Sequence, residues 1–463
     1  MAGLSISGLV SNMDTATIID QLMAVEANPQ TLLAQRLSRT QQQVTAYRDV
    51  NSRVDALRTA AEKLAGDSAW QSVKATSSST AVSASATTGA APGSLSFRVD
   101  WVAKAHSVIS TQKWTATDQQ TAADLDFGAA TIDVEVGGTT HTITVDRNGD
   151  GRSTLAEAAA AITARSDLGL SATAVRTSPT QYQLQVTSTK TGEASRFDVG
   201  APDTFTTVTQ GANAQLTVGE GTGYKVTSAT NTFTGLLDGV TLTVTEPASS
   251  VTVQVATDPE AIADHVQALV TSANALLDAI STRTDSTSST AVLKGDSALR
   301  QLTSRVLDVL SFAVGEDGSS SAVGLELTQN GRYTFDETAF LDKLAADPAV
   351  VQRMFRQVTT LPGPDGDAAT TSDNQSLPTG IAAKLADIAR TASNTTDGTL
   401  TLLVKSTEER AKDLDERVEA WDLRLELRRT TLTRQFTAME TALGTLRNQA
   451  SWLSSQLSSL SSS

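Results

Sequence analysis

The sequence predicts an α+β protein: long terminal α-helices form a coiled-coil or bundle leg, and a β-rich head of two small domains is inserted into it. Apolar residues recur at alternating spacings of three and four near both ends, which is typical of helices that pack on each other. Between these regions, apolar and polar residues alternate with period two, as in half-buried strands. Because helical patterns enclose the strand patterns, an inserted head is the simplest architecture.

The N-terminal pattern predicts two helices. Asp14 is a suitable N-cap for a short helix that carries Ile18 and Leu22, and Asn28-Pro29 should interrupt that helix. A second helix is then expected to run to about Ala65. Its apolar seam is Leu33, Leu37, Val44, Tyr47, Val54, Leu57, Ala61 and Leu64.

The middle of the chain predicts the head. Period-two alternation occupies residues 95–101, 132–136, 182–186, 240–244 and 251–255. Residues of about 76–256 are therefore expected to be β-rich, with one helix from Leu155 to Ala164. After Asp258-Pro259 the pattern returns to helix, at residues 261–280 and 297–310.

The C-terminal helix is the longest predicted element, and at about 60 residues it would span roughly 90 Å. Its seam is Leu400, Val404, Ala411, Leu414, Val418, Trp421, Leu425, Leu432, Phe436, Met439, Leu443, Leu446, Ala450, Leu453, Leu457 and Leu460. An extra four-residue step between Leu432 and Phe436 predicts a local unwinding of the supercoil. No single globular domain needs a helix this long.

Charge divides each end into two parts. Residues 1–35 hold three charged side chains and residues 36–63 hold nine; residues 405–429 hold fifteen and residues 430–463 hold three. A helix in water carries a charged outer face, so the two outer segments are predicted to meet other protein, although the alternative is that they fray. The predicted contact residues are Ile18, Leu22, Met23, Phe436, Met439, Leu443, Trp452, Leu453 and Leu457.

Composition limits the partners. The 463 residues correspond to about three domains, and the formal net charge is −15. An acidic chain without a Lys/Arg block repels phosphate backbones and anionic bilayers, so nucleic acid and membranes are not expected as partners. The absence of cysteine fits a protein that works outside the cell. No signal-peptide pattern opens the chain and no apolar run approaches a membrane span, so we expect export without a cleaved signal peptide.

The sequence does not predict catalysis. His106, His141 and His265 fall in different predicted elements without a partner at metal-binding spacing, and no Gly-x-Ser-x-Gly motif is present. These histidines are predicted to be ordinary surface or core residues. Trp421 lies on the seam and is expected in the core. Trp452 lies beside the seam. It either contacts another protein, which would be a second subunit or an export chaperone, or packs within the chain.

One motif fits a calcium loop. Asp146, Asn148 and Asp150 occupy positions 1, 3 and 5, Gly151 the turn position, and Glu157 position 12, while the Arg152 carbonyl would be the ligand at position 7. A strand rather than a helix precedes this loop, and Ser153 replaces the usual apolar residue. The alternative is a turn followed by a Thr154–Glu157 capping box. No cofactor is required, and calcium is a candidate ligand.

The chain resembles the family of flagellar filament-capping proteins, hook-associated protein 2 or FliD. The segment from Ser7 to Thr15 is similar to the opening signature of that family, which usually has Gly and Leu where this chain has Asn12 and Met13. Residues 129–195 resemble a β module of flagellar axial proteins, with Thr163 in place of its usual Asn. The C-terminal pattern is similar at Gly295-Asp296, Gly324-Leu325, Asn330-Gly331, Phe335-Asp336, Asp347-Pro348 and Met354-Phe355.

The resemblance implies a non-enzymatic, secreted, homo-oligomeric ring at the filament tip, which promotes flagellin folding and insertion and prevents flagellin loss. Its partners would be further copies of itself, flagellin and the hook–filament junction proteins, with an export chaperone as a further candidate. Expected parts are filament-contacting segments 1–35 and 430–463, a leg of 36–75 and 257–429, a head domain of 76–128 and 201–256, and a module of 129–200. The alternatives are a surface adhesin that binds glycans through the head, or another axial protein, such as a junction or minor filament subunit.

Overall fold

The computed structural model describes residues 13–117, 119–146, 149–219, 223–311, 317–362 and 375–461. The chain divides into a helical unit, Met1–Asp67 with Ala263–Ser463, and a β unit, Ser68–Ile262. The predicted α+β class, with long terminal helices and an inserted β-rich middle, is confirmed. Within the described part of the chain, no helix combines the length and apolar character that crossing a bilayer requires.

The first two helices begin and end as the sequence predicts. Asp14 accepts the backbone N–H of Thr17 at 3.1 Å and so caps α1 (Thr15–Glu26). Hydrogen bonds from the hydroxyl and the backbone N–H of Thr17 lower the pKa of Asp14. Pro29 occupies the first turn of α2 (Asn28–Ala65), where proline is tolerated, and its ring could not continue α1.

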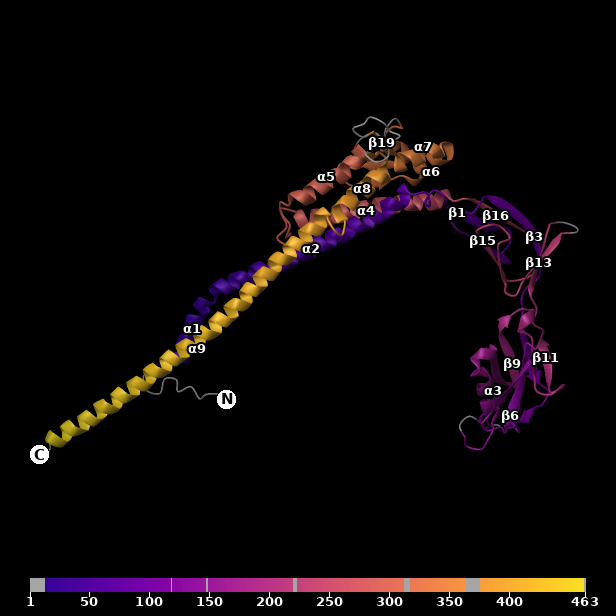
Figure 1. Cartoon of the computed structure of the whole chain (residues 1–463), viewed down its shortest axis with the longest axis horizontal. Helices are drawn as coiled ribbons and strands as arrows, with labels where there is room; N and C mark the ends of the chain where they lie inside the picture. Colours follow the sequence, from indigo (N-terminus) through magenta and orange to yellow (C-terminus); the bar gives the residue numbers. More distant parts are fainter. Residues whose placement is uncertain are drawn as a thin grey trace. The chain divides into compact units, whose positions relative to one another are not determined.

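The long helix α9 (Thr399–Ser461) runs antiparallel to α1 and α2. Three ion pairs show the direction, because higher numbers on one side meet lower numbers on the other: Arg48–Glu408 at 2.6 Å, Glu26–Arg428 at 3.1 Å and Asp20–Arg429 at 2.6 Å. Figure 1 shows α9 extending beside these two helices. The predicted seam thus pairs the two ends of the chain.

Five further α-helices of the helical unit lie in the described part of the chain. They are α4 (Pro259–Thr284), α5 (Ser297–Ser311), α6 (Glu337–Ala346), α7 (Pro348–Arg356) and α8 (Ile381–Ser393). Two hairpins join them, β17 (Leu325–Leu327) with β18 (Tyr333–Phe335), and β19 (Val358–Leu361) with β20 (Gln375–Pro378). Phe340 is fully buried between Phe335 and Phe355, with ring centroids 5.5 and 6.1 Å away.

The aspartates of the C-terminal sequence pattern start helices. Asp296, Asp336 and Asp347 each accept the backbone N–H of the third residue of the helix that follows, α5, α6 or α7, at 2.9 to 3.1 Å. Asp296 also accepts the hydroxyl of Tyr47, which joins the start of α5 to α2. Burial, together with this bond, raises the pKa of Tyr47. These motifs therefore fix the ends of helices rather than form a reactive site.

The β unit contains two hydrophobic cores. The first lies under a five-stranded antiparallel sheet and a three-stranded sheet. The five-stranded sheet has the order β1 (Val73–Ser77), β16 (Ala248–Thr257), β3 (Gly93–Trp101), β12 (Ala214–Val218) and β13 (Tyr224–Ser228). The three-stranded sheet has the order β14 (Thr232–Thr234), β15 (Val240–Val244) and β2 (Val82–Ala86).

The second core surrounds α3 (Leu155–Thr163). One sheet has the order β11 (Phe205–Thr209), β4 (Ala105–Ser110), β9 (Gln181–Thr191) and β5 (Trp114–Thr115), with β8 (Leu170–Ser178) also paired to β9. The other has the order β10 (Phe197–Val199), β6 (Thr131–Val136) and β7 (Thr139–Thr144). This core takes in Val108, Trp114 and Leu125, which precede the predicted module of residues 129–200. The packed domain thus begins earlier than the module, because β4 pairs with β9.

Candidate functional site

The apolar seam of α9 is buried or half-buried as far as Met439 and exposed beyond it. Leu400 and Leu432 are buried, Phe436 and Met439 are half-buried, and the seam is exposed from Leu443 onward as far as its side chains are described. Trp421, expected in the core, is half-buried, and the Arg424 guanidinium lies 4.8 Å from the centre of its ring. The inner part of the seam therefore packs inside the chain, whereas its outer apolar side chains are exposed among the described residues.

The predicted contact residues divide in the same way. Ile18 and Met23 on α1 are half-buried, as are Phe436 and Met439. The others are exposed, most strongly Trp452, of which 64% is accessible. The exposed contact residues are Leu22, Leu443, Trp452, Leu453 and Leu457. That they touch another protein stays a prediction.

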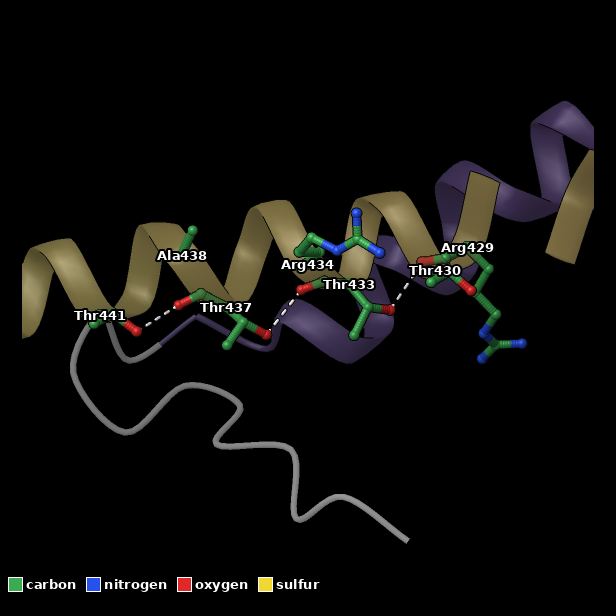
Figure 2. A pocket seen from close by; sticks show the side chains of 7 residues that line it. All are labelled: Arg429, Thr430, Thr433, Arg434, Thr437, Ala438 and Thr441. Atoms are coloured by element: carbon green, nitrogen blue, oxygen red, sulfur yellow. Dashed lines mark hydrogen bonds between the residues drawn. The ribbon is translucent and has the colours of Figure 1, made fainter. Parts of the chain in front are cut away.

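A line of threonines follows the outer part of α9. Thr433, Thr437, Thr441 and Thr445 each donate a hydroxyl hydrogen bond to the carbonyl four residues earlier, at 2.8 to 3.0 Å. Figure 2 shows three of them beside an open groove of about 640 Å³, lined by Arg429, Thr430, Thr433, Arg434, Thr437, Ala438 and Thr441. Because the hydroxyl protons are used within the helix, these side chains cannot donate them to a partner.

Apolar residues outside the predicted seam are also exposed. Val25 and Leu32 on the N-terminal helices and Leu423 and Leu427 on α9 have accessible fractions of 57 to 70%. Sequence reasoning missed them because they do not follow the spacing of the seam. The four-residue step from Leu423 to Leu427 was the available signal, since residues four apart share a helix face.

The acidic loop brings three of its predicted ligands together. Oxygens of Asp146, Asp150 and Glu157 lie within 4.8 Å of one another, whereas Asn148 lies outside the described residues. Asp146 accepts the backbone N–H groups of Gly149 and Gly151 at 2.8 and 3.0 Å. Asp150 accepts the N–H of Arg152 at 2.8 Å, so the loop is folded around its acidic side chains.

The capping interpretation of Glu157 is confirmed. Its Oε2 accepts the backbone N–H and the hydroxyl of Thr154 at 2.9 and 3.0 Å, and Thr154 Oγ1 accepts the N–H of Glu157 at 3.2 Å. This capping box starts α3. The two interpretations of Glu157 remain compatible, because a carboxylate that caps a helix keeps lone pairs for a cation.

The histidines lie apart in the fold. His106 is buried in β4, where its Nδ1 accepts the backbone N–H of Gly211 at 3.2 Å and its ring contacts Phe197 edge-on at 5.0 Å. His106 is thus a satisfied core residue, as predicted. His265 lies on α4, and burial together with the nearby charge of Lys63 lowers its pKa. Among the described residues, the acidic loop is the one cluster with the composition of a metal site, and it contains no histidine.

Comparisons with known proteins agree on one family. The model described as "Flagellar hook-associated protein 2 N-terminus" matches residues 11–106, and the corresponding C-terminus model matches residues 211–448. The chain is 30% identical to the lateral flagellar hook-associated protein 2 of Vibrio parahaemolyticus over 302 residues, or 59% of this chain and just under two thirds (65%) of that protein. It is 23% identical to flagellar hook-associated protein 2 of Salmonella typhimurium, with both chains covered completely.

A solved structure has the same fold. It contains the D1-D2-D3 domains of the flagellar cap protein FliD from Escherichia coli, with a TM-score of 0.53 at 21% sequence identity. The match covers 78% of this chain and 99% of that chain. At this identity the likeness establishes the fold and does not extend to individual contacts.

Proposed function

Because the chain belongs to the flagellar hook-associated protein 2 family, whose members cap flagellar filaments, we propose that it works as a homo-oligomeric ring at the filament tip. There it helps exported flagellin to fold and insert, and prevents its loss to the medium. The family is structural, which agrees with a non-enzymatic role. The match of both terminal models favours a cap over another axial protein and over a glycan-binding adhesin.

The observation that supports this role is the exposed, charge-poor end of α9. A cap must hold the filament while subunits insert beneath it, which requires many weak, reversible contacts rather than one tight anchor. Leu446, Leu453 and Leu457 offer exposed apolar surface in a segment with three charged side chains. Flagellin and the hook–filament junction proteins are the partners we propose for it. Export without a cleaved signal peptide and an export chaperone stay predictions.

Ring formation provides the direct test. We expect the purified full-length protein to form closed oligomers whose population rises with concentration, because cyclic closure needs several copies. Multi-angle light scattering measures the mass, and negative-stain images show whether the particles are closed. A protein that remains monomeric at high concentration, with no rings in the images, contradicts the proposed function.

We also propose that the acidic loop is a weak calcium site. Three carboxylates within 4.8 Å repel one another, and a divalent cation would offset that repulsion. Sites in extracellular modules have Kd values of about 10⁻⁴ to 10⁻³ M. Binding at a hundredfold excess over Kd would stabilise the folded state by about 2.7 kcal/mol.

The melting temperature of the β unit, followed in the full-length protein, tests this site. Calcium is expected to raise it by several degrees over the value in chelator. Glu157→Gln keeps a side chain that can complete the capping box but loses the carboxylate charge, so its calcium-dependent shift should disappear. Thr154→Ala is the matched control: it weakens the cap and should keep the shift. Equal melting of all three proteins with calcium and with chelator contradicts the site.

A further inference from the structure

Two edges of α9 carry opposite charge between Glu408 and Arg428. The acidic edge is Glu408, Asp415, Glu419, Asp422 and Glu426. The basic edge is Arg410, Arg417, Arg424 and Arg428. Residues seven apart share a helix face, since two turns take about 7.2 residues, whereas residues two apart lie about 200° apart around the helix. The half-buried seam of Ala411, Leu414, Val418, Trp421 and Leu425 separates the two edges.

The middle of both edges is exposed. Asp415, Glu419 and Glu426 form no ion pair within the described part of the chain, and neither does Arg410. Arg417 contacts Asp413 of its own helix at 3.0 Å, a pair in which both side chains are more than half exposed. An exposed pair of this kind contributes little and exchanges easily.

At their ends the two edges form ion pairs within the chain. Glu408 binds Arg48 of α2, and Arg428 binds Glu26 of α1. These contacts, together with the half-buried seam, show which side of α9 faces α1 and α2. Between them, Asp422 accepts a hydrogen bond from the Gln30 side chain of α2, and the exposed Asp415, Arg417 and Glu419 lie at the sides of the helix pair.

Cyclic symmetry makes the spacing of these charges informative. Rotation about an axis carries each residue to the same height in the next copy. Twice along α9 an aspartate is followed two positions later by an arginine. The pairs are Asp415 with Arg417 and Asp422 with Arg424. Along the helix the two members of a pair differ in height by only about 3 Å. Two neighbouring copies can therefore place Asp415 opposite Arg417, and Asp422 opposite Arg424, without sliding.

We propose that α9 of one copy binds α9 of the next copy through these edges, acidic edge against basic edge, and that this contact sets the order of subunits in the ring. The inference rests on the proposed ring. A two-fold contact through either edge would bring like charges together, so the edges favour a head-to-tail arrangement that closes a ring. Charge pairs of this kind decide partner and register more than affinity.

Charge reversal tests the contact. One variant is Asp415→Lys with Asp422→Lys, a second is Arg417→Glu with Arg424→Glu, and a third combines all four changes. Either edge reversed alone should raise the concentration needed for ring formation by roughly tenfold or more, because like charges then face each other at every interface. The combined variant exchanges the two edges and should form rings as the parent does.

The control reverses two acids that are also seven residues apart, Glu409→Lys with Glu416→Lys, on the face opposite the seam. Sedimentation velocity at low and high salt gives the ring fraction, and circular dichroism shows that the helix is kept. If the single-edge variants form rings as stable as those of the parent, this inference is wrong, whereas the proposed ring itself still stands. Failure of the combined variant to recover also overturns it, since the charges then act within one chain. A monomeric parent contradicts the proposed function itself.

Discussion

Removing residues 430–463 is expected to abolish filament capping while the β unit stays folded, so that flagellin is lost to the medium as monomer. The deletion removes the exposed, charge-poor end of α9 but leaves Glu408–Arg48 and Arg428–Glu26 in place. In cells that lack the parent gene, the measurements are filament length and the flagellin content of the culture supernatant. Removal of residues 1–35 is expected to have the same effect.

Replacing side chains instead of deleting residues tests whether the apolar surface of α9, rather than its length, is needed for capping. Leu446→Gln with Leu453→Gln and Leu457→Gln keeps a full-length helix but removes exposed apolar surface, so it should reproduce much of the defect. The matched control, Ser451→Gln with Ser454→Gln, changes exposed polar positions of the same segment and should cap normally. Normal filaments from the truncated protein would show that the outer end of α9 has no part in capping.

Phe340→Ala is expected to have the largest effect on stability. Phe340 is fully buried and packs edge-on against both Phe335 and Phe355. Truncation of a buried phenylalanine removes apolar contacts and leaves a cavity, which typically costs about 3–5 kcal/mol. That loss is a large fraction of the roughly 5–15 kcal/mol that stabilises a domain. The melting temperature of the helical unit should fall by about 10 °C.

Phe436→Ala makes the same chemical change at a half-buried position on the outer part of α9. Its melting temperature should stay close to that of the parent, because few atoms lose contacts there. A calorimetric scan of each purified protein gives both values. Equal shifts for the two variants would mean that Phe340 is not in the centre of a packed core.

Parts of the candidate site that depend on residues close together in the sequence could be predicted, and parts that depend on distant segments could not. The acidic loop and its capping box span twelve positions of continuous sequence, so residue spacing was enough to find Asp146, Asp150 and Glu157. The exposed Leu423 and Leu427 were not found, because they lie off the seam spacing by which the contact residues were chosen. Trp421 follows the seam spacing, yet a two-helix contact leaves it half-buried.

The sequence alone determined the features that come from local order. Apolar spacing gave the long terminal helices, Asp14 and Pro29 gave the boundaries of the first helices, and period-two alternation gave the strands of the β unit. The motifs that carry the family resemblance are of the same kind, because Asp296, Asp336 and Asp347 each cap a helix within three residues.

Only the tertiary structure decided which elements are neighbours. β1 and β3 both pair with β16, from the far end of the β unit, and β11 pairs with β4 beyond the module that the sequence delimited. Helix α8 was not predicted from the sequence. Lys384, Asp387 and Arg390 form its one polar stripe, and neighbouring segments cover the rest of the helix, with Leu385 and Ile381 completely buried. A residue pattern reports which face of an element is apolar. It does not report which distant segment covers that face, since many pairings bury similar area and the choice among them is made by the packing of the whole chain.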